Sequence, residues 1–95
     1  MKTIFRNPIH VNSKSHDCIF AEIKGKKVKL TYQAYNAAEK FNVELFDGDK
    51  WNHFLSMVDM GIVPDSTNYV SDGAKRKKRA DDLFKKAEEI CNKVL

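Results

Sequence analysis

The chain has 95 residues, 42% of them apolar, and a formal net charge of +4. This composition can form one hydrophobic core, so we expect a single domain over residues 1–95. Arg6 and Pro8 interrupt the apolar residues near the N-terminus and no later run is long enough to span a membrane, so neither a secretory leader nor a membrane partner is expected. Cys18 and Cys91 are the only cysteines, and the lack of a disulfide framework predicts a cytoplasmic protein.

The first third of the chain predicts β structure. Residues 3–11 favour an extended edge strand, because Pro8 lacks the backbone donor that a central strand needs. Residues 17–23 and 28–32 both alternate apolar side chains with period two, and Gly25 between them predicts a β-hairpin. We therefore expect a small N-terminal antiparallel sheet of about three strands.

The middle of the chain predicts two helices. Apolar residues recur at helical spacing over residues 34–41, after Thr31, which can cap a helix. A second helix is expected to begin at Asp49, because apolar residues after it follow a 3.6-residue repeat, and Gly61 with Pro64 marks its stop. The residues of that repeat are Trp51, Phe54, Leu55, Val58 and Ile62.

The C-terminal part predicts a connector followed by an amphipathic helix. Residues 63–79 are assigned to a connector plus basic segment, since residues 63–74 are rich in turn formers. The stable helix is expected to begin near Arg79, because cations are unfavourable at a helix N-terminus whereas Asp81 suits a first turn. Its apolar stripe consists of Ala80, Leu83, Phe84, Ala87, Ile90, Cys91 and Val94. The predicted fold class is α+β, with a sheet of about three strands packed against about three helices.

All of the excess positive charge lies at the C-terminal end. Residues 75–95 hold eight Lys or Arg against four Asp or Glu. Five consecutive cations at residues 75–79, the basic segment, would surround the whole circumference of a helix, so no face of it can be buried without burying a cation. We therefore expect this segment to stay solvated or to contact an anion such as a phosphate backbone. A stretch that serves only solubility is the simpler alternative.

The leading hypothesis is a small nucleic-acid-binding protein, for RNA or DNA, that makes largely sequence-tolerant phosphate contacts. Lysine dominates the cations and lacks the forked geometry with which arginine reads bases. The predicted contact residues are Lys75, Arg76, Lys77, Lys78, Arg79, Lys85, Lys86, Lys24, Lys26 and Lys27. Tyr32, Tyr35 and Tyr69 would stack on bases if they are exposed.

A resemblance to a helix-turn-helix motif covers residues 37–43 and the predicted helix around Trp51. The connection between the two is longer than the usual turn, and Asp47 and Asp49 would repel DNA at the end of the recognition helix. A plain helical hairpin in the core is the simpler interpretation. If the basic segment is not the binding surface, the next candidate is the side of this helix that carries Lys50, His53, Met57 and Met60.

The alternative function is a small inhibitor or adaptor, of the type that phages and mobile elements direct against host or defence proteins. Its basic segment would steer it to an acidic protein partner. No cofactor, metal or enzymatic activity is expected. The histidines and cysteines lack the paired spacing of a zinc site, the acids at 44–49 do not match a calcium loop, and no catalytic motif is present.

Overall fold

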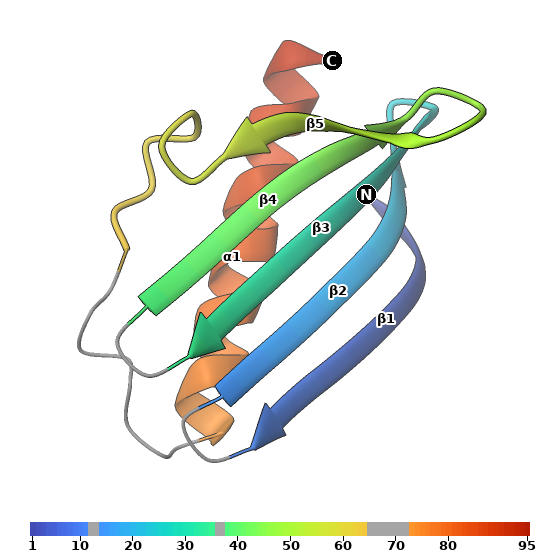
Figure 1. Cartoon of the computed structure of the whole chain (residues 1–95). Helices are drawn as coiled ribbons and strands as arrows, with labels where there is room; N and C mark the ends of the chain where they lie inside the picture. The colour runs from blue at the N-terminus through green and yellow to red at the C-terminus, as the bar shows by residue number, and fades with distance from the viewer. Residues whose placement is uncertain (12–13, 36–37, 65–72) are drawn as a thin grey trace.

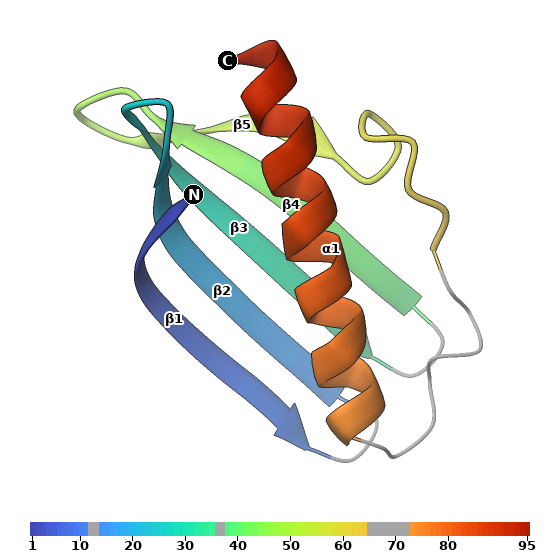
Figure 2. The same ribbon diagram turned by 180° about the vertical axis from the view of Figure 1, so that it is seen from behind.

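A computed structural model of the protein describes residues 1–11, 14–35, 38–64 and 73–95. Its elements in chain order are β1 (Lys2–Val11), β2 (Lys14–Ile23), β3 (Lys26–Tyr35), β4 (Ala38–Phe46), β5 (Trp51–Ser56) and α1 (Gly73–Val94). The strands form one antiparallel sheet in the order β1-β2-β3-β4-β5. Helix α1 packs across one face of this sheet, which leaves the opposite face uncovered by any described element (Figures 1 and 2).

The expected arrangement of about three strands against about three helices is wrong. The sheet has five strands, and within the described residues α1 is the single helix. Both predicted internal helices are replaced by strands, since β3 ends at Tyr35, β4 begins at Ala38 and Trp51 begins β5. The helix-turn-helix resemblance and the helical hairpin are therefore both wrong.

Side-chain alternation explains why the segment 38–46 is a strand. Phe41 and Val43 are buried, whereas Lys40 is exposed and Asn42 lies half-buried on the other face. A short apolar run fits the helical and the extended period almost equally well, and pairing with β3 decides in favour of the strand.

A tight turn replaces the predicted helix cap at Asp49. The Asp47 carboxylate accepts hydrogen bonds from the backbone N–H groups of Asp49 and Lys50 at 3.0 and 2.9 Å. Gly48 adopts a φ of 94°, which glycine reaches at little cost. The acidic residues therefore build the β4–β5 turn, and the chain reverses into β5 instead of starting a helix.

The predicted hairpin and edge strand are confirmed. Strands β2 and β3 pair with Ile23 opposite Lys26, and Lys24 and Gly25 form the turn with φ values of 51° and 76°. Two residues with positive φ match the right-handed twist of the flanking strands. Strand β1, which contains Pro8, lies at the edge of the sheet next to β2.

The core lies between the sheet and α1. Val28, Leu30 and Tyr32 of β3 point toward the helix and are fully buried. From the helix side, Phe84 packs against Phe41 with ring centroids 5.5 Å apart. Burial of each large apolar side chain contributes roughly 1.5–3 kcal/mol, so this layer holds the two elements together.

Helix α1 begins at Gly73 and includes the basic segment, so the expected start near Arg79 is wrong. The predicted apolar stripe is confirmed in its central part, where Leu83, Phe84 and Ala87 are buried. Arg76 is also fully buried, so the basic segment contributes to the packed side of the helix. Across the ranges that the structure describes, no helix combines the length and apolar character needed to cross a membrane.

A buried carboxylate fastens α1 to the sheet. Glu39 of β4 accepts hydrogen bonds from Nε and Nη2 of Arg79, at 3.1 and 3.0 Å, and from the hydroxyl of Tyr32 at 2.6 Å. Arg79 Nη2 also donates to the backbone carbonyl of Val63 at 3.0 Å. One ion pair thus connects the helix, two central strands and the segment after β5.

We predict that Glu39→Gln lowers the free energy of unfolding by about 3 kcal/mol, because it leaves the Arg79 guanidinium without its charged partner at a buried position. Urea denaturation followed by far-UV circular dichroism measures the change. The control is Lys78→Gln, which removes an exposed charge from the same helix and should change stability by less than about 0.5 kcal/mol. Equal effects of the two substitutions would contradict the structural role of this ion pair.

Candidate nucleic-acid interface

The basic segment does not form a continuous cationic surface. Arg76 is fully buried and Arg79 binds Glu39 of the sheet, so neither arginine belongs to an open cationic surface. Lys75, Lys77 and Lys78 are exposed on α1. The expectation that the whole segment stays solvated is therefore wrong for Arg76, because its side chain lies on the packed side of the helix.

The remaining predicted cations of α1 are mixed with acids. Lys85 and Lys86 are exposed, but Asp81, Asp82 and Glu89 are exposed on the same helix. Without the two arginines, α1 carries six lysines against four carboxylates. Two of these carboxylates are engaged with other parts of the fold, Asp81 with Arg6 and Glu88 with the N-terminal amine. The solvent side of the helix is therefore cationic, but acids interrupt its lysines.

The turn lysines lie apart from the basic segment. Lys24 Nζ donates to the backbone carbonyl of Leu95 at 3.3 Å, and Lys26 is exposed beside it. Lys27 points to the face of the sheet opposite α1, because its neighbour Val28 points into the core. Lys27 is therefore separated from the exposed lysines of α1, which lies on the other face of the sheet.

The other predicted surfaces are only partly present. Met57 and Met60 are buried in the core, so the expected exposed side around Trp51 is wrong for them. Tyr32 is also fully buried, whereas Tyr35 is 56% exposed and available for stacking. Tyr69 lies outside the described residues.

The face of the sheet opposite α1, called the open face below, carries a cluster of four aromatic side chains. Phe20 lies at the centre of this aromatic cluster, with ring centroids 6.3 Å from Phe5 and 5.6 Å from Trp51. Phe46 contacts Trp51 at 5.1 Å. Phe5 is 55% exposed, so the cluster presents an aromatic surface to solvent.

Lysines are interleaved with these rings. Lys29 Nζ lies 5.7 Å from the ring centroid of Phe20, and Lys27 Nζ lies at the same distance from that of Phe46. The register places five lysines against two glutamates on the open face, a surplus of three positive charges. These residues are Lys2, Lys14, Lys27, Lys29 and Lys40, with Glu22 and Glu44.

Sequence reasoning placed Lys27 among the contact residues but missed the aromatic face to which it belongs, although one signal was present. Lys27 and Lys29 alternate with Val28 and Leu30, which requires that the lysines point away from the core. Phe20 belongs to the same face, because its neighbour Ile19 is buried under α1. The two-residue alternation of side chains that identified the strands therefore also defined a second face, which is cationic and aromatic.

A hollow of about 470 Å³ lies beside the aromatic cluster in the middle of the open face. We call it the central hollow. Its volume is in the range of small-molecule sites. Side chains from four strands line it, among them Asn7, Phe20, Lys29, Thr31, Gln33 and Asn42.

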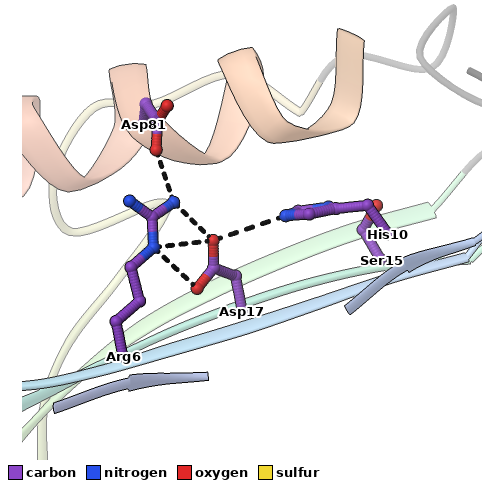
Figure 3. Close-up of polar contacts among 5 residues, drawn as sticks. All are labelled: Arg6, His10, Ser15, Asp17 and Asp81. Carbon is purple, nitrogen blue, oxygen red and sulfur yellow. Dashed lines mark hydrogen bonds and ion pairs between the residues drawn. The ribbon is translucent and has the colours of Figure 1, made fainter. Parts of the chain in front are cut away.

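A Ser–His–Asp cluster lies on the opposite, covered face of the sheet (Figure 3). His10 Nδ1 is 2.9 Å from Ser15 Oγ, and His10 Nε2 is 3.5 Å from Asp17 Oδ2. Arg6 Nε lies 3.2 Å from both oxygens of Asp17, and Arg6 also binds Asp81 of α1. The hydrogen bonds to Asp17 raise the pKa of Arg6 above its ordinary value.

These residue types form nucleophilic triads in enzymes, but their surroundings here favour a structural role. Ser15 is 5% exposed and Asp17 is fully buried. Asp17 is bound on both oxygens by Arg6, which makes it a poor partner for a catalytic histidine. The cluster therefore connects β1 and β2 to α1.

We predict that Asp17→Asn lowers the free energy of unfolding by about 3 kcal/mol, because it breaks the ion pair with Arg6 at a buried position. Ser15→Ala is the matched change in the same cluster and should cost about 1 kcal/mol, the net value of one hydrogen bond. Chemical denaturation of both variants measures these differences. A hydrolytic activity that Ser15→Ala abolished without loss of stability would show that the cluster is catalytic.

The open face is the candidate interface because it combines aromatic rings, cations and a hollow on one surface. Comparison of the chain with protein-family models, with curated proteins and with solved structures found no match in any of the three. The function is therefore inferred from the chemistry of the described residues.

Proposed function

We propose that this protein binds single-stranded nucleic acid, RNA or DNA, across the open face of its sheet. The observation that carries the proposal is the aromatic cluster with lysines at its rings. Aromatic side chains stack on unpaired bases and contribute about 1–3 kcal/mol per base, while cations contact the phosphates. The aromatic rings and the lysines lie on the same face, so one strand of nucleic acid can contact both.

An unpaired strand fits this face better than a duplex does. In a duplex the bases are stacked on one another, so their flat sides cannot reach an aromatic ring on a protein surface. The exposed ring of Phe5 can stack on an unpaired base at the surface of the sheet. Lysine supplies the cations, which favours contacts with phosphates over recognition of particular bases.

The charges suggest a path along β3. Lys29 beside Phe20 and Tyr35 at the far end of β3 are six residues apart, or about 20 Å in an extended strand. Lys14 Nζ lies 4.9 Å from the Tyr35 ring centroid, so a cation accompanies an aromatic ring at both ends. A strand laid along this line meets stacking and phosphate contacts at each end.

The β4–β5 turn limits this path on one side. Asp47 is an exposed carboxylate that is negative at neutral pH, and hydrogen bonding from the Lys50 backbone lowers its pKa further. A phosphate close to the turn would be repelled. The favourable region therefore lies over β2 and β3 and not over the turn.

We predict a salt dependence that reports the lysine contacts. If Lys14, Lys27, Lys29 and Lys40 neutralise one phosphate each, log K should fall against log salt with a slope of about −2.8 for a single strand. Lys27→Gln/Lys29→Gln removes two of the four contacts and should reduce the slope to about −1.4. Fluorescence anisotropy with labelled oligonucleotides at several salt concentrations measures both slopes.

The control for this experiment is Lys77→Gln/Lys78→Gln, which removes the same charge from exposed positions of α1. Its slope should stay near that of the unchanged protein. A slope near zero for the unchanged protein would contradict nucleic-acid binding. If both variants reduce the salt slope equally, binding depends on the net charge of the molecule and not on the lysines of the open face.

A second candidate function is supported by the edge strand β1. Ile4, Ile9 and Val11 are 58%, 52% and 57% exposed, and exposed apolar side chains on an edge strand are typical of protein contacts. Pro8 lacks a backbone donor and interrupts pairing with an added strand, so side chains would dominate such a contact. We therefore propose as the alternative a small inhibitor or adaptor that docks on a protein through β1.

Affinity capture from a nuclease-treated lysate distinguishes the two functions. A protein partner should survive nuclease and be lost in Ile4→Ser/Ile9→Ser, because these substitutions remove exposed apolar surface. Captured nucleic acid should disappear with nuclease and be reduced in Lys27→Gln/Lys29→Gln. Loss of a nuclease-resistant partner in the isoleucine variant alone would favour the inhibitor or adaptor over the nucleic-acid binder.

A further inference from the structure

We propose that the central hollow holds one unpaired nucleobase and recognises its hydrogen-bonding edge. This inference rests on the proposed binding of a single strand to the open face. It goes further than that proposal because phosphate contacts and stacking tolerate any base, whereas a base held in the hollow would be selected. The protein would then prefer strands that carry one kind of base at one position.

Three side-chain amides carry the inference. Asn7 of β1, Gln33 of β3 and Asn42 of β4 all line the hollow. In the part of the chain that the structure describes, none of these amides has an intramolecular hydrogen-bond partner. Each amide offers one acceptor and two donor hydrogens, so the hollow contains hydrogen-bonding capacity that the fold does not use.

The remaining walls suit a flat aromatic ligand. Phe5 and Phe20 border the hollow on the side of the aromatic cluster, where they can stack on a ring. Cys18 is 7% exposed and contributes an uncharged part of the lining, and the Thr31 hydroxyl lies 3.9 Å from its sulfur. A nucleobase has the matching chemistry, with an apolar flat side and a polar edge.

The charges around the hollow favour a base that belongs to a strand of phosphates. Lys29 and Glu44 both line the hollow, with Lys29 Nζ 4.0 Å from Glu44 Oε1, so these two charges offset each other and the surplus lysines lie around the hollow. The open face as a whole carries more lysines than carboxylates. Amides place a donor beside an acceptor, the arrangement with which Asn and Gln form paired hydrogen bonds to a base edge.

The test uses octamers with an abasic sugar–phosphate backbone that carry a single A, C, G or T at a central position, with a fully abasic octamer for comparison. These probes keep the phosphates constant and place only one base at the hollow. We expect one base to bind at least about fivefold more tightly than the others, within the range of about 5- to 150-fold that paired hydrogen bonds provide. Equal affinities for all four bases would overturn the inference.

The variant Asn7→Ala/Gln33→Ala/Asn42→Ala should reduce the preference to less than about twofold and leave the salt slope unchanged, because its lysines remain. Asn7 and Gln33 are exposed and Asn42 is half-buried, so the variant should keep its melting temperature. Asn92→Ala removes an amide from α1 and should leave the preference intact. A preference that persists in the triple variant would place recognition outside the hollow.

The outcomes separate this inference from the proposed function. If binding to ordinary oligonucleotides depends steeply on salt but shows no base preference, base recognition in the hollow is wrong and the proposed function stands. Absence of binding to every oligonucleotide would overturn both. If the triple variant instead loses a nuclease-resistant protein partner, the hollow is a protein contact and the nucleobase assignment is wrong.

Discussion

A single helix can cover only one face of a five-stranded sheet, and the other features of this protein depend on that constraint. Along each strand, alternate side chains must therefore serve two different environments. In β3, Leu30 packs under α1 while Lys29 points to the open face. The same strands thus supply the core and an accessible surface, and a substitution on one face leaves the adjacent residue of the other face in place.

Charged residues hold the helix over its face. Arg79 pairs with Glu39, and Asp81, two residues further along α1, pairs with Arg6. The pair with Glu39 neutralises one positive charge of the C-terminal region, whereas the pair with Arg6 neutralises one of its negative charges. The cations that remain accessible are lysines, which are distributed between the outer side of α1 and the open face. The proposed nucleic-acid binding therefore depends on where the lysines lie more than on how many there are.

The sequence predicted the local features that depend on neighbouring residues, and it did not predict those that depend on pairing. Lys24 and Gly25 form the expected hairpin turn, and Leu83 and Phe84 lie on the expected helical stripe. Residues 51–56 fit a helical repeat, but pairing with β4 makes them a strand. The interior position of Arg76 and the open face were missed for the same reason, since both require knowledge of which surface α1 covers. The amides that line the central hollow come from three strands and have no common motif in the sequence.

The order of elements along the chain has a consequence for synthesis. All five strands precede α1 in the chain, so they leave the ribosome before the helix that covers them. Until then Val28, Leu30 and Phe41 face water, and a two-sided sheet with apolar residues is prone to self-association. Packing of α1 buries the apolar residues of the covered face and leaves the open face accessible. On the other side, five lysines against two glutamates give every copy of the chain the same sign of charge, which opposes face-to-face association.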